Sequence, residues 1–239
     1  MHPLFEELDY CPTPIGAVSL RRRMELTLKR EVYEIKLDDE FLMSSLFTAS
    51  EEALSRLGLA ALGGNRLDVV VGGLGLGYTA RAVLEHDHVA SLAVVEMLVP
   101  VIDWHRKGLL PLGPGLTGDP RCRFVEGDFF EFAASERGFD PASPGRRFDA
   151  ILLDIDHSPE ALLDKRSTSF YQPDGLRALA AHLKPGGIFG LWSNDGPDPA
   201  FTERLASVFA EAWAEPITFH NPLLGTPFTQ SVYLARRGE

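Results

Sequence analysis

A cluster of glycines directly after a run of β-branched residues constrains this chain most. Residues 69–77 read Val-Val-Val-Gly-Gly-Leu-Gly-Leu-Gly, and residues 78–85 have the composition of a helix. The glycines are Gly72, Gly73, Gly75 and Gly77. Glycine lets a ligand approach the backbone, and the following helix offers free N–H groups. Strand, glycine turn and helix together predict the opening of a nucleotide-binding βα unit; a tight turn without a ligand is the alternative.

Length and charge limit the class of protein. The chain has 239 residues, enough for one large domain or for a domain with a small appendage. Its formal net charge is −11, which argues against general nucleic-acid binding because phosphate contacts need Lys and Arg. A cationic substrate fits this charge, although solubility explains it equally well.

The number of cysteines and the hydropathy pattern indicate the cellular compartment in which we expect the protein. Cys11 and Cys122 are the two cysteines, too few for a disulfide framework. No apolar run approaches the roughly 20 residues of a membrane span, and no apolar leader follows a basic start. We therefore expect a cytoplasmic protein without a membrane partner.

The first 48 residues differ in pattern from the rest. Residues 1–14 carry three prolines and are expected to be irregular, whereas residues 15–45 alternate in short β-prone segments that predict two hairpins. We assign 1–48 to a small antiparallel β-appendage and 49–239 to the main domain. The main domain opens with a helix that has Ser50 as its N-cap and ends near Gly58 or near Gly63-Gly64.

Strands and helices alternate through the main domain. Strands are expected at residues 67–71, 92–96, 122–125, 148–154, 188–192, 217–219 and 231–235. Helices are expected at residues 78–85, 98–107, 129–135, 173–183 and 199–212, with a loop over 111–120. This order predicts an α/β fold, a Rossmann-like, doubly wound, mostly parallel seven-stranded sheet. Ligands of such sheets bind at the carboxyl ends of the strands.

Acidic residues stand at those strand ends. Glu96 lies about twenty residues after the glycines, the spacing of an acid that binds ribose hydroxyls; capping of the next helix is the alternative. Asp128 is suited to accept from an adenine amino group, with Phe129 or Phe130 flanking the ring, or to cap helix 129–135. Asp154 ends the next strand. These residues converge on a nucleoside site.

The motifs also indicate which nucleotide is bound. No Gly-Lys-Ser/Thr follows the glycines, so an adenosine without phosphates is favoured over a nucleoside triphosphate. The segments 148–154 (Phe-Asp-Ala-Ile-Leu-Leu-Asp) and 183–187 (Leu-Lys-Pro-Gly-Gly) resemble motifs of class I S-adenosylmethionine-dependent transferases. That resemblance implies a reversed last strand.

Within that superfamily, residues 15–236 resemble the spermidine synthase group of aminopropyltransferases. The resemblance is carried by the glycine turn, Val94-Val95-Glu96, Gly127-Asp128, segment 148–154 and Ser169-Phe170-Tyr171. It implies decarboxylated S-adenosylmethionine as the donor, methylthioadenosine as a product, a small-molecule amine as the acceptor and a homodimer. It also makes Asp154 the catalytic base, because Asp154 matches the first aspartate of the family's Asp-x-x-Asp-Pro segment; a loop-ordering acid is the alternative.

The chain departs from this family pattern around the amine. Gly75 stands where the family's glycine turn carries an aspartate, and His157 replaces the second aspartate after segment 148–154. Ser50-Glu51-Glu52 aligns with a family segment that opens with tyrosine. Asp156, His157 and Tyr171 are the expected substrate-binding residues, although a loop histidine bonded to a neighbour also explains His157.

Two other functions stay open. The first is methyl transfer from ordinary S-adenosylmethionine, in one version assisted by Mg²⁺ on Asp154, Asn194 and Asp195. The last two residues stand in the reverse order to the catechol-type enzymes, and no metal is expected in the leading interpretation. The second alternative is a nucleoside-binding paralogue without turnover, suggested by the altered amine residues.

Overall fold

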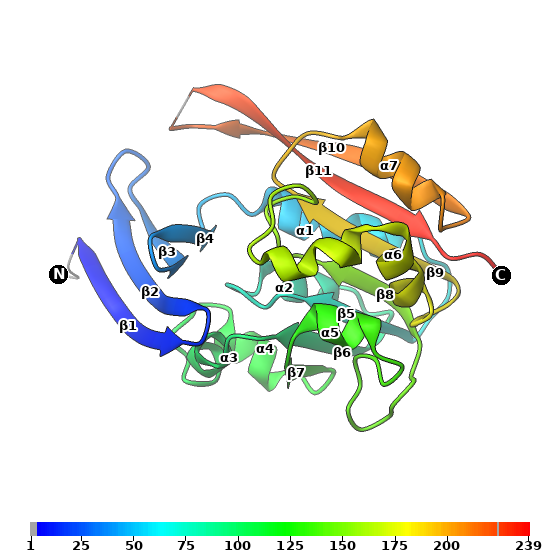
Figure 1. Ribbon diagram of the computed structural model, residues 1–239. Helices are drawn as coiled ribbons and strands as arrows, with labels where there is room; N and C mark the ends of the chain where they lie inside the picture. The colour runs from blue at the N-terminus through cyan, green and yellow to red at the C-terminus, as the bar shows by residue number, and fades with distance from the viewer. Residues whose placement is uncertain (1–3, 224) are drawn as a thin grey trace.

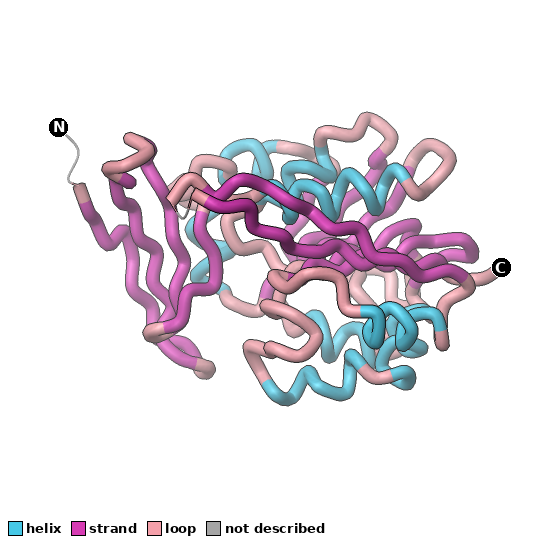
Figure 2. The backbone as a smooth tube through the Cα atoms, turned by 90° about the horizontal axis from the view of Figure 1, so that it is seen from above, coloured by secondary structure: helices cyan, strands magenta, loops and turns pink. Residues whose placement is uncertain are grey.

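The computed structural model describes residues 4–223 and 225–239. A four-stranded antiparallel sheet comes first in the chain, in the order β1-β2-β3-β4. Its strands are β1 (Phe5–Thr13), β2 (Gly16–Glu25), β3 (Arg30–Leu37) and β4 (Glu40–Ser44). Figure 1 and Figure 2 show this sheet at one end of the molecule, opposite the C-terminus.

The larger sheet has the order β10-β11-β9-β8-β5-β6-β7 among the described residues. The strands are β5 (Leu67–Gly72), β6 (Val89–Glu96), β7 (Cys122–Glu126), β8 (Phe148–Leu153), β9 (Leu183–Ser193), β10 (Glu211–Asn221) and β11 (Thr226–Arg236). β5 pairs in parallel with β6 and β8, and β11 runs antiparallel to both of its neighbours. The expected mostly parallel seven-stranded sheet with a reversed last strand is confirmed.

Helices cover both faces of this sheet (Figure 1). They are α1 (Ala49–Ala60), α2 (Tyr78–Leu84), α3 (Val99–Arg106), α4 (Gly113–Gly118), α5 (Phe129–Ala134), α6 (Pro173–Ala180) and α7 (Pro199–Ala206), with a 3-10 helix at Lys165–Tyr171. No helix in the described ranges is long and apolar enough to cross a membrane.

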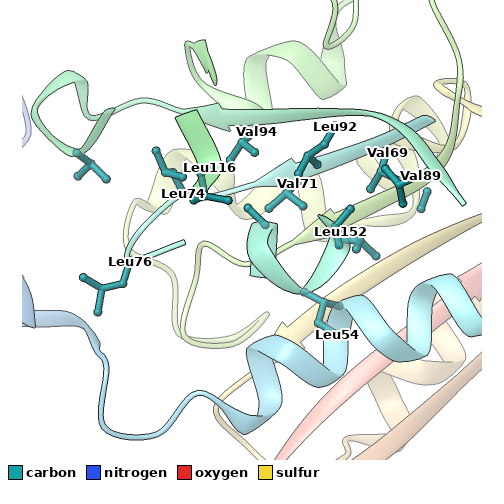
Figure 3. Packing of buried hydrophobic residues seen from close by; sticks show 14 of the residues in the cluster. Leu54, Val69, Val71, Leu74, Leu76, Val89, Leu92, Val94, Leu116 and Leu152 are labelled. Atoms are coloured by element: carbon teal, nitrogen blue, oxygen red, sulfur yellow. The ribbon is translucent and has the colours of Figure 1, made fainter. Parts of the chain in front are cut away.

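The two faces of the sheet follow from the alternation of side chains along β5. Val69 and Val71 pack on one side with Leu54 of α1 and Leu152 of β8 (Figure 3). Val70 faces the other side, where α5, α6 and α7 supply a second apolar cluster. Successive residues of a strand point to opposite faces, so three consecutive valines bury both. This places the carboxyl end of β5, and the glycine turn, between two packed layers.

The first strand corrects the sequence analysis. Residues 5–13 form an edge strand, not the irregular segment that their prolines suggested; residues 1–3 lie outside the described part of the chain. Pro12 is tolerated because an edge strand needs hydrogen bonds on one side only. The segment after Glu25, expected to be a strand, contains the turn between β2 and β3.

Other boundaries also differ. Residues 111–120, expected to be a loop, contain the short helix α4, and α7 ends at Ala206 because the chain turns there into an eleven-residue β10. Thr48, not Ser50, precedes α1. Ser50 lies inside the helix, and its hydroxyl is buried against the large sheet.

The four-stranded sheet and the C-terminal hairpin approach each other. β10 and β11 extend beyond the core of the large sheet toward β4 (Figure 1, Figure 2). The ring of Phe219 on β10 stacks on Phe47, which follows β4, with centroids 5.7 Å apart. A large cavity lies between these elements and the strand ends of the large sheet.

Candidate active site

The cavity opens at the carboxyl ends of the parallel strands, where this fold class binds its ligands. Its volume is about 1160 Å³. The nucleoside-type residues expected from the sequence line one side, namely Gly73, Gly75, Glu96, Asp128 and Phe129. The β-appendage lines the other side with apolar side chains, namely Ile15, Ile35, Leu37, Phe41, Leu42 and Phe47. The cavity is large enough for a nucleoside and a second small molecule.

The glycine turn reaches the cavity through two of its four glycines. Gly73 has φ +92°, and a Cβ on it would lie 2.1 Å from the carbonyl oxygen of Asp154. Gly75 has φ +45° and also lines the cavity. Gly72 and Gly77 do not line it: a Cβ on Gly72 would meet the Phe129 ring, and one on Gly77 would meet Leu116. At Gly72 and Gly77 the neighbouring side chains pack so closely on the backbone that they leave no room for a Cβ.

Glu96 is held in place by the backbone. Its Oε2 accepts from the N–H of Leu74 at 3.0 Å, and its Oε1 accepts from the N–H of Leu98 at 2.8 Å. Burial raises the pKa of this carboxyl, which the backbone donors partly offset. Each carboxylate oxygen keeps a lone pair for a further donor. The side chain can therefore both order the turn and accept from ligand hydroxyls.

Asp128 caps α5 and faces the cavity at the same time. Its Oδ1 accepts from the N–H of Phe130 at 2.8 Å, the N-cap geometry that the sequence analysis gave as one of two roles. Phe129 is buried and stacks on Phe139 with centroids 4.9 Å apart. Phe130 is only partly buried and also lines the cavity. Both phenylalanines are thus available at the wall beside Asp128.

Asp154 directly follows β8 and lines the cavity. Its backbone N–H donates to Gly72 at 2.8 Å, which fixes it beside the glycine turn. The Asp154 side chain accepts a hydrogen bond: Thr79 Oγ1 donates to its Oδ2 at 2.5 Å. Burial raises the pKa of Asp154 to about 6, and the Thr79 bond opposes that rise. A carboxyl with such a pKa is suited to exchange protons near neutrality.

A second buried acid, Glu51, was missed by the sequence analysis as a site residue. It lies in the first turn of α1, is 7% exposed and lines the cavity. Burial raises its pKa to about 8, and the neighbouring Asp154 adds to the rise. Acidic residues in a first helical turn usually interact with the helix dipole, so the local pattern did not show that this one points inward. The family alignment of Ser50-Glu51-Glu52 was the signal that could have found it.

Glu51 is supported by a hydrogen-bonded network. Ser50 Oγ lies 2.8 Å from Glu51 Oε2 and 2.6 Å from Gln230 Oε1, and it accepts from Trp192 Nε1 at 2.8 Å. Gln230 Nε2 in turn donates to Asn194 Oδ1 at 2.9 Å. These side chains come from α1, β9, β11 and the segment after β9, so only the folded sheet brings them together.

Asp156 and Tyr171, both expected to bind substrate, bond to each other. Tyr171 Oη donates to Asp156 Oδ2 at 2.6 Å, and the N–H of Leu163 donates to Oδ1 at 2.7 Å. Asp156 is 4% exposed at the cavity wall, whereas Tyr171 is buried behind it and does not line the cavity. Any effect of Tyr171 on a ligand would pass through Asp156 and the loop it orders.

His157 lies at the cavity wall nearest the appendage. Its Nε2 is 3.3 Å from Glu40 Oε1 on β4, and its carbonyl oxygen accepts from the N–H of Asn194 at 2.7 Å. The contact with Glu40 is the neighbour-bonded arrangement considered above as the alternative. Asn194 also lines the cavity, but Asp195 is exposed and does not. The structure therefore does not bring Asp154 and Asp195 to one site.

Comparison with known proteins decides the family. The family model described as the spermine/spermidine synthase domain matches residues 48–205, well over half of the chain. This chain belongs to the spermine/spermidine synthase family. The match begins at the junction after β4 and ends in α7, so it contains the glycine turn, Glu96, Asp128 and Asp154.

Curated relatives agree with this assignment over part of their length. Polyamine aminopropyltransferase 2 of Pseudomonas aeruginosa is 29% identical over 154 residues, which is 60% of this chain and 40% of that protein. A polyamine aminopropyltransferase of Aeropyrum pernix is 30% identical over 138 residues, 58% of this chain and 40% of that protein. The aligned part of the chain thus spans about two fifths of these relatives.

Solved structures share the fold. The spermidine synthase of Thermotoga maritima aligns with a TM-score of 0.72 at 20% identity, covering 97% of this chain and 72% of that one. A spermidine synthase in complex with the transition-state analogue AdoDATO gives 0.74 at 20% identity, covering 97% and 74%. Human methyltransferase-like protein 13 in complex with SAH gives 0.57 at 19% identity, covering 79% and 82%. The expected class I methyltransferase-like fold is confirmed.

Proposed function

We propose that this protein transfers an aminopropyl group from decarboxylated S-adenosylmethionine to a small-molecule amine. The observation that carries the proposal is the position of Asp154, which lines the cavity beside the glycine turn in a member of the spermine/spermidine synthase family. The names of the matched relatives support aminopropyl transfer over methyl transfer. A cytoplasmic location and a homodimer remain part of this proposal.

The donor fits the side of the cavity that the sequence analysis assigned to a nucleoside. Glu96 accepts from the ribose hydroxyls, Asp128 accepts from the adenine amino group, and Phe129 or Phe130 covers the ring. Gly73 and Gly75 leave room for the backbone to approach the sulfonium end. None of these roles needs a metal ion or a phosphate-binding lysine.

The reaction is an in-line displacement. The lone pair of the acceptor amine forms a new C–N bond to the propyl carbon, the C–S bond breaks, and neutral methylthioadenosine leaves with the electron pair. The proton of the new ammonium passes to Asp154, whose raised pKa lets it hold a proton near neutral pH. Most of the acceleration comes from holding the amine and the carbon in contact.

The acceptor lies against the appendage. Phe41, Leu42 and Phe47 present an apolar wall suited to an aliphatic chain, and His157, which contacts Glu40, lines the same cavity. In this proposal His157 and Asp156 remain on the acceptor side, and Tyr171 supports them from behind. The acceptor class is therefore an amine that carries an apolar chain.

Incubation with the decarboxylated donor and a panel of aliphatic mono-, di- and polyamines tests the proposal. We expect methylthioadenosine to form together with an amine that is heavier by one aminopropyl group, detected by mass spectrometry. Asp154→Asn should lower the rate by a factor of about 100 or more while donor affinity changes little. Methyl transfer from S-adenosylmethionine, or donor binding without any product, would contradict the proposal and favour one of the two alternatives.

A further inference from the structure

Glu51 has no role in the reaction described above, yet it is a buried acid inside the reaction cavity. It is 7% exposed, and no described lysine, arginine or histidine forms an ion pair with it or with Asp154. Its recorded side-chain partner is the Ser50 hydroxyl, at 2.8 Å. Burial without a cation favours the protonated form of Glu51, so a cationic group of a ligand that binds beside it would favour the carboxylate form.

The charged groups that raise the pKa of Glu51 are acidic. Asp154 faces it from the end of β8, and Glu52 follows it on α1. Thr79 of α2 connects the two sides, since its Oγ1 lies 3.5 Å from the Glu51 carbonyl oxygen and 2.5 Å from Asp154 Oδ2. β9 and β11 contribute only the neutral Trp192 and Gln230. This corner therefore attracts cations and repels carboxylates.

The other acidic residues that line the cavity already have hydrogen-bond or ion-pair partners, or lie on its other side. Asp156 accepts three hydrogen bonds, from Leu163, Tyr171 and Ser167. Asp164 pairs with Arg166 and Asp174 with Arg177 at the exposed rim. Glu96, Asp128 and Glu131 lie on the nucleoside side. Glu51 and Asp154 thus remain as the buried carboxyl groups that can meet an ammonium near the reacting carbon.

We propose that the Glu51 carboxylate binds the primary ammonium group of the donor's side chain and selects the decarboxylated donor over S-adenosylmethionine. This inference rests on the proposed function, because it takes a sulfonium nucleoside as the ligand. Asp154 is left free for the acceptor proton. The carboxylate of S-adenosylmethionine would meet Glu51 and Asp154 as a like charge, whereas the aminopropyl chain brings only a positive one.

Calorimetric titration of the wild-type chain and two variants tests this assignment. The ligands are the decarboxylated donor, S-adenosylmethionine and methylthioadenosine, which lacks the charged chain. Glu51→Gln keeps the shape of the side chain and an oxygen that can accept from the Ser50 hydroxyl. Glu52→Gln is the matched control, because Glu52 pairs with Arg56 at 2.8 Å and does not line the cavity.

We expect Glu51→Gln to lower the affinity for the decarboxylated donor by at least about tenfold, the usual effect of losing a charge-assisted hydrogen bond. Methylthioadenosine should bind unchanged, the preference over S-adenosylmethionine should shrink, and Glu52→Gln should match the wild type. The inference would be overturned if Glu51→Gln lowered the affinities for the donor and for methylthioadenosine equally, or if it left the donor affinity unchanged. Failure of all three ligands to bind the wild type would instead overturn the proposed function.

Proton release provides a readout that a purely structural role would not move. Burial keeps Glu51 and Asp154 protonated to higher pH than ordinary carboxyls. An ammonium bound at Glu51 favours the ionised form of that side chain, so binding of the decarboxylated donor at pH 7 should release protons. Titration in two buffers of different ionisation enthalpy measures this release. It should fall in Glu51→Gln; equal release in both proteins would count against Glu51.

Discussion

Met43 on β4 lies against the glycine turn of the large sheet. Its Sδ is 3.1 Å from the backbone N of Leu76, and a Cβ added to Gly75 would lie 2.7 Å from the same sulfur. The appendage therefore occupies the space into which a side chain at position 75 would project. Gly75, which the family resemblance marked as a departure, is matched by this contact from another part of the chain.

We expect Gly75→Asp to destabilise the protein by about 1–3 kcal/mol, the usual cost of overpacking. The cost should be smaller in a Met43→Ala background, because the sulfur is then absent. Chemical denaturation of the two single variants and the double variant measures this coupling. Gly63→Asp is the control, since no atom lies within 4 Å of a Cβ there. Additive effects of the two changes would contradict the contact.

Thr79 is expected to position Asp154 and to tune its proton affinity. The Thr79 hydroxyl bond lowers the pKa of Asp154 against the effect of burial. Thr79→Val should therefore move the acidic limb of the pH profile of kcat/KM to higher pH and reduce the rate at pH 7 by about tenfold. Thr117→Val, which removes a hydroxyl bonded within α4, is the control. An unchanged pH profile would count against this role.

The buried acids make a specific prediction about stability and pH. Burial raises the pKa of Glu51 from 4.5 to about 8 and that of Asp154 from 3.8 to about 6. The folded state then binds more protons than the unfolded state, so the free energy of unfolding falls as the pH rises through this window. The slope is up to about 1.4 kcal/mol per pH unit for each proton.

Urea unfolding of the ligand-free protein between pH 5 and pH 8 measures this dependence. Glu51→Gln should flatten the decline, because the amide cannot ionise, and the variant should be the more stable protein at pH 8. Glu52→Gln should leave the slope as it is in the wild type, since Glu52 is paired with arginine. Parallel curves for the wild type and Glu51→Gln would contradict the shifted pKa.

A separate ion-pair network lies near the start of β5, away from the cavity. Asp140 is 2% exposed and accepts from Arg123 Nη1 at 2.7 Å and from Arg146 Nη1 at 2.9 Å. Arg146 also pairs with Asp68 of β5. The two guanidinium groups hold the pKa of Asp140 well below its usual range. This depressed pKa stabilises the fold above about pH 4, and the contribution is lost as the pH falls toward the folded pKa.

Asp140→Asn should cost about 2 kcal/mol of unfolding free energy at pH 7, less than for a fully buried pair because both arginines are partly exposed. Asp174→Asn is the control, since Asp174 is exposed and pairs with Arg177 at the surface. Thermal unfolding at pH 7 and pH 3 checks both variants. A loss that persists undiminished at pH 3 would point to packing instead of charge.

Local sequence predicted the centre of the sheet best. The glycine turn, Glu96, Asp128 and Asp154 each follow an apolar strand, and their order alone placed them at one edge of a parallel sheet. The first strand was missed because Pro12 masks an edge strand, and α4 was missed because glycine and proline dominate it. In both elements the local pattern is weak, because proline and glycine dilute it.

The sequence by itself determined the fold class, the placing of Glu96, Asp128 and Asp154 at the strand ends and the family resemblance, because strand alternation and turn glycines are local properties. Only the tertiary structure turned Glu51 inward beside Asp154, brought Met43 to Gly75, and buried Tyr171 behind Asp156. These relations join segments that no local pattern connects. The electrostatics around Glu51 and Asp154 therefore arise from packing between α1, α2 and the strand ends.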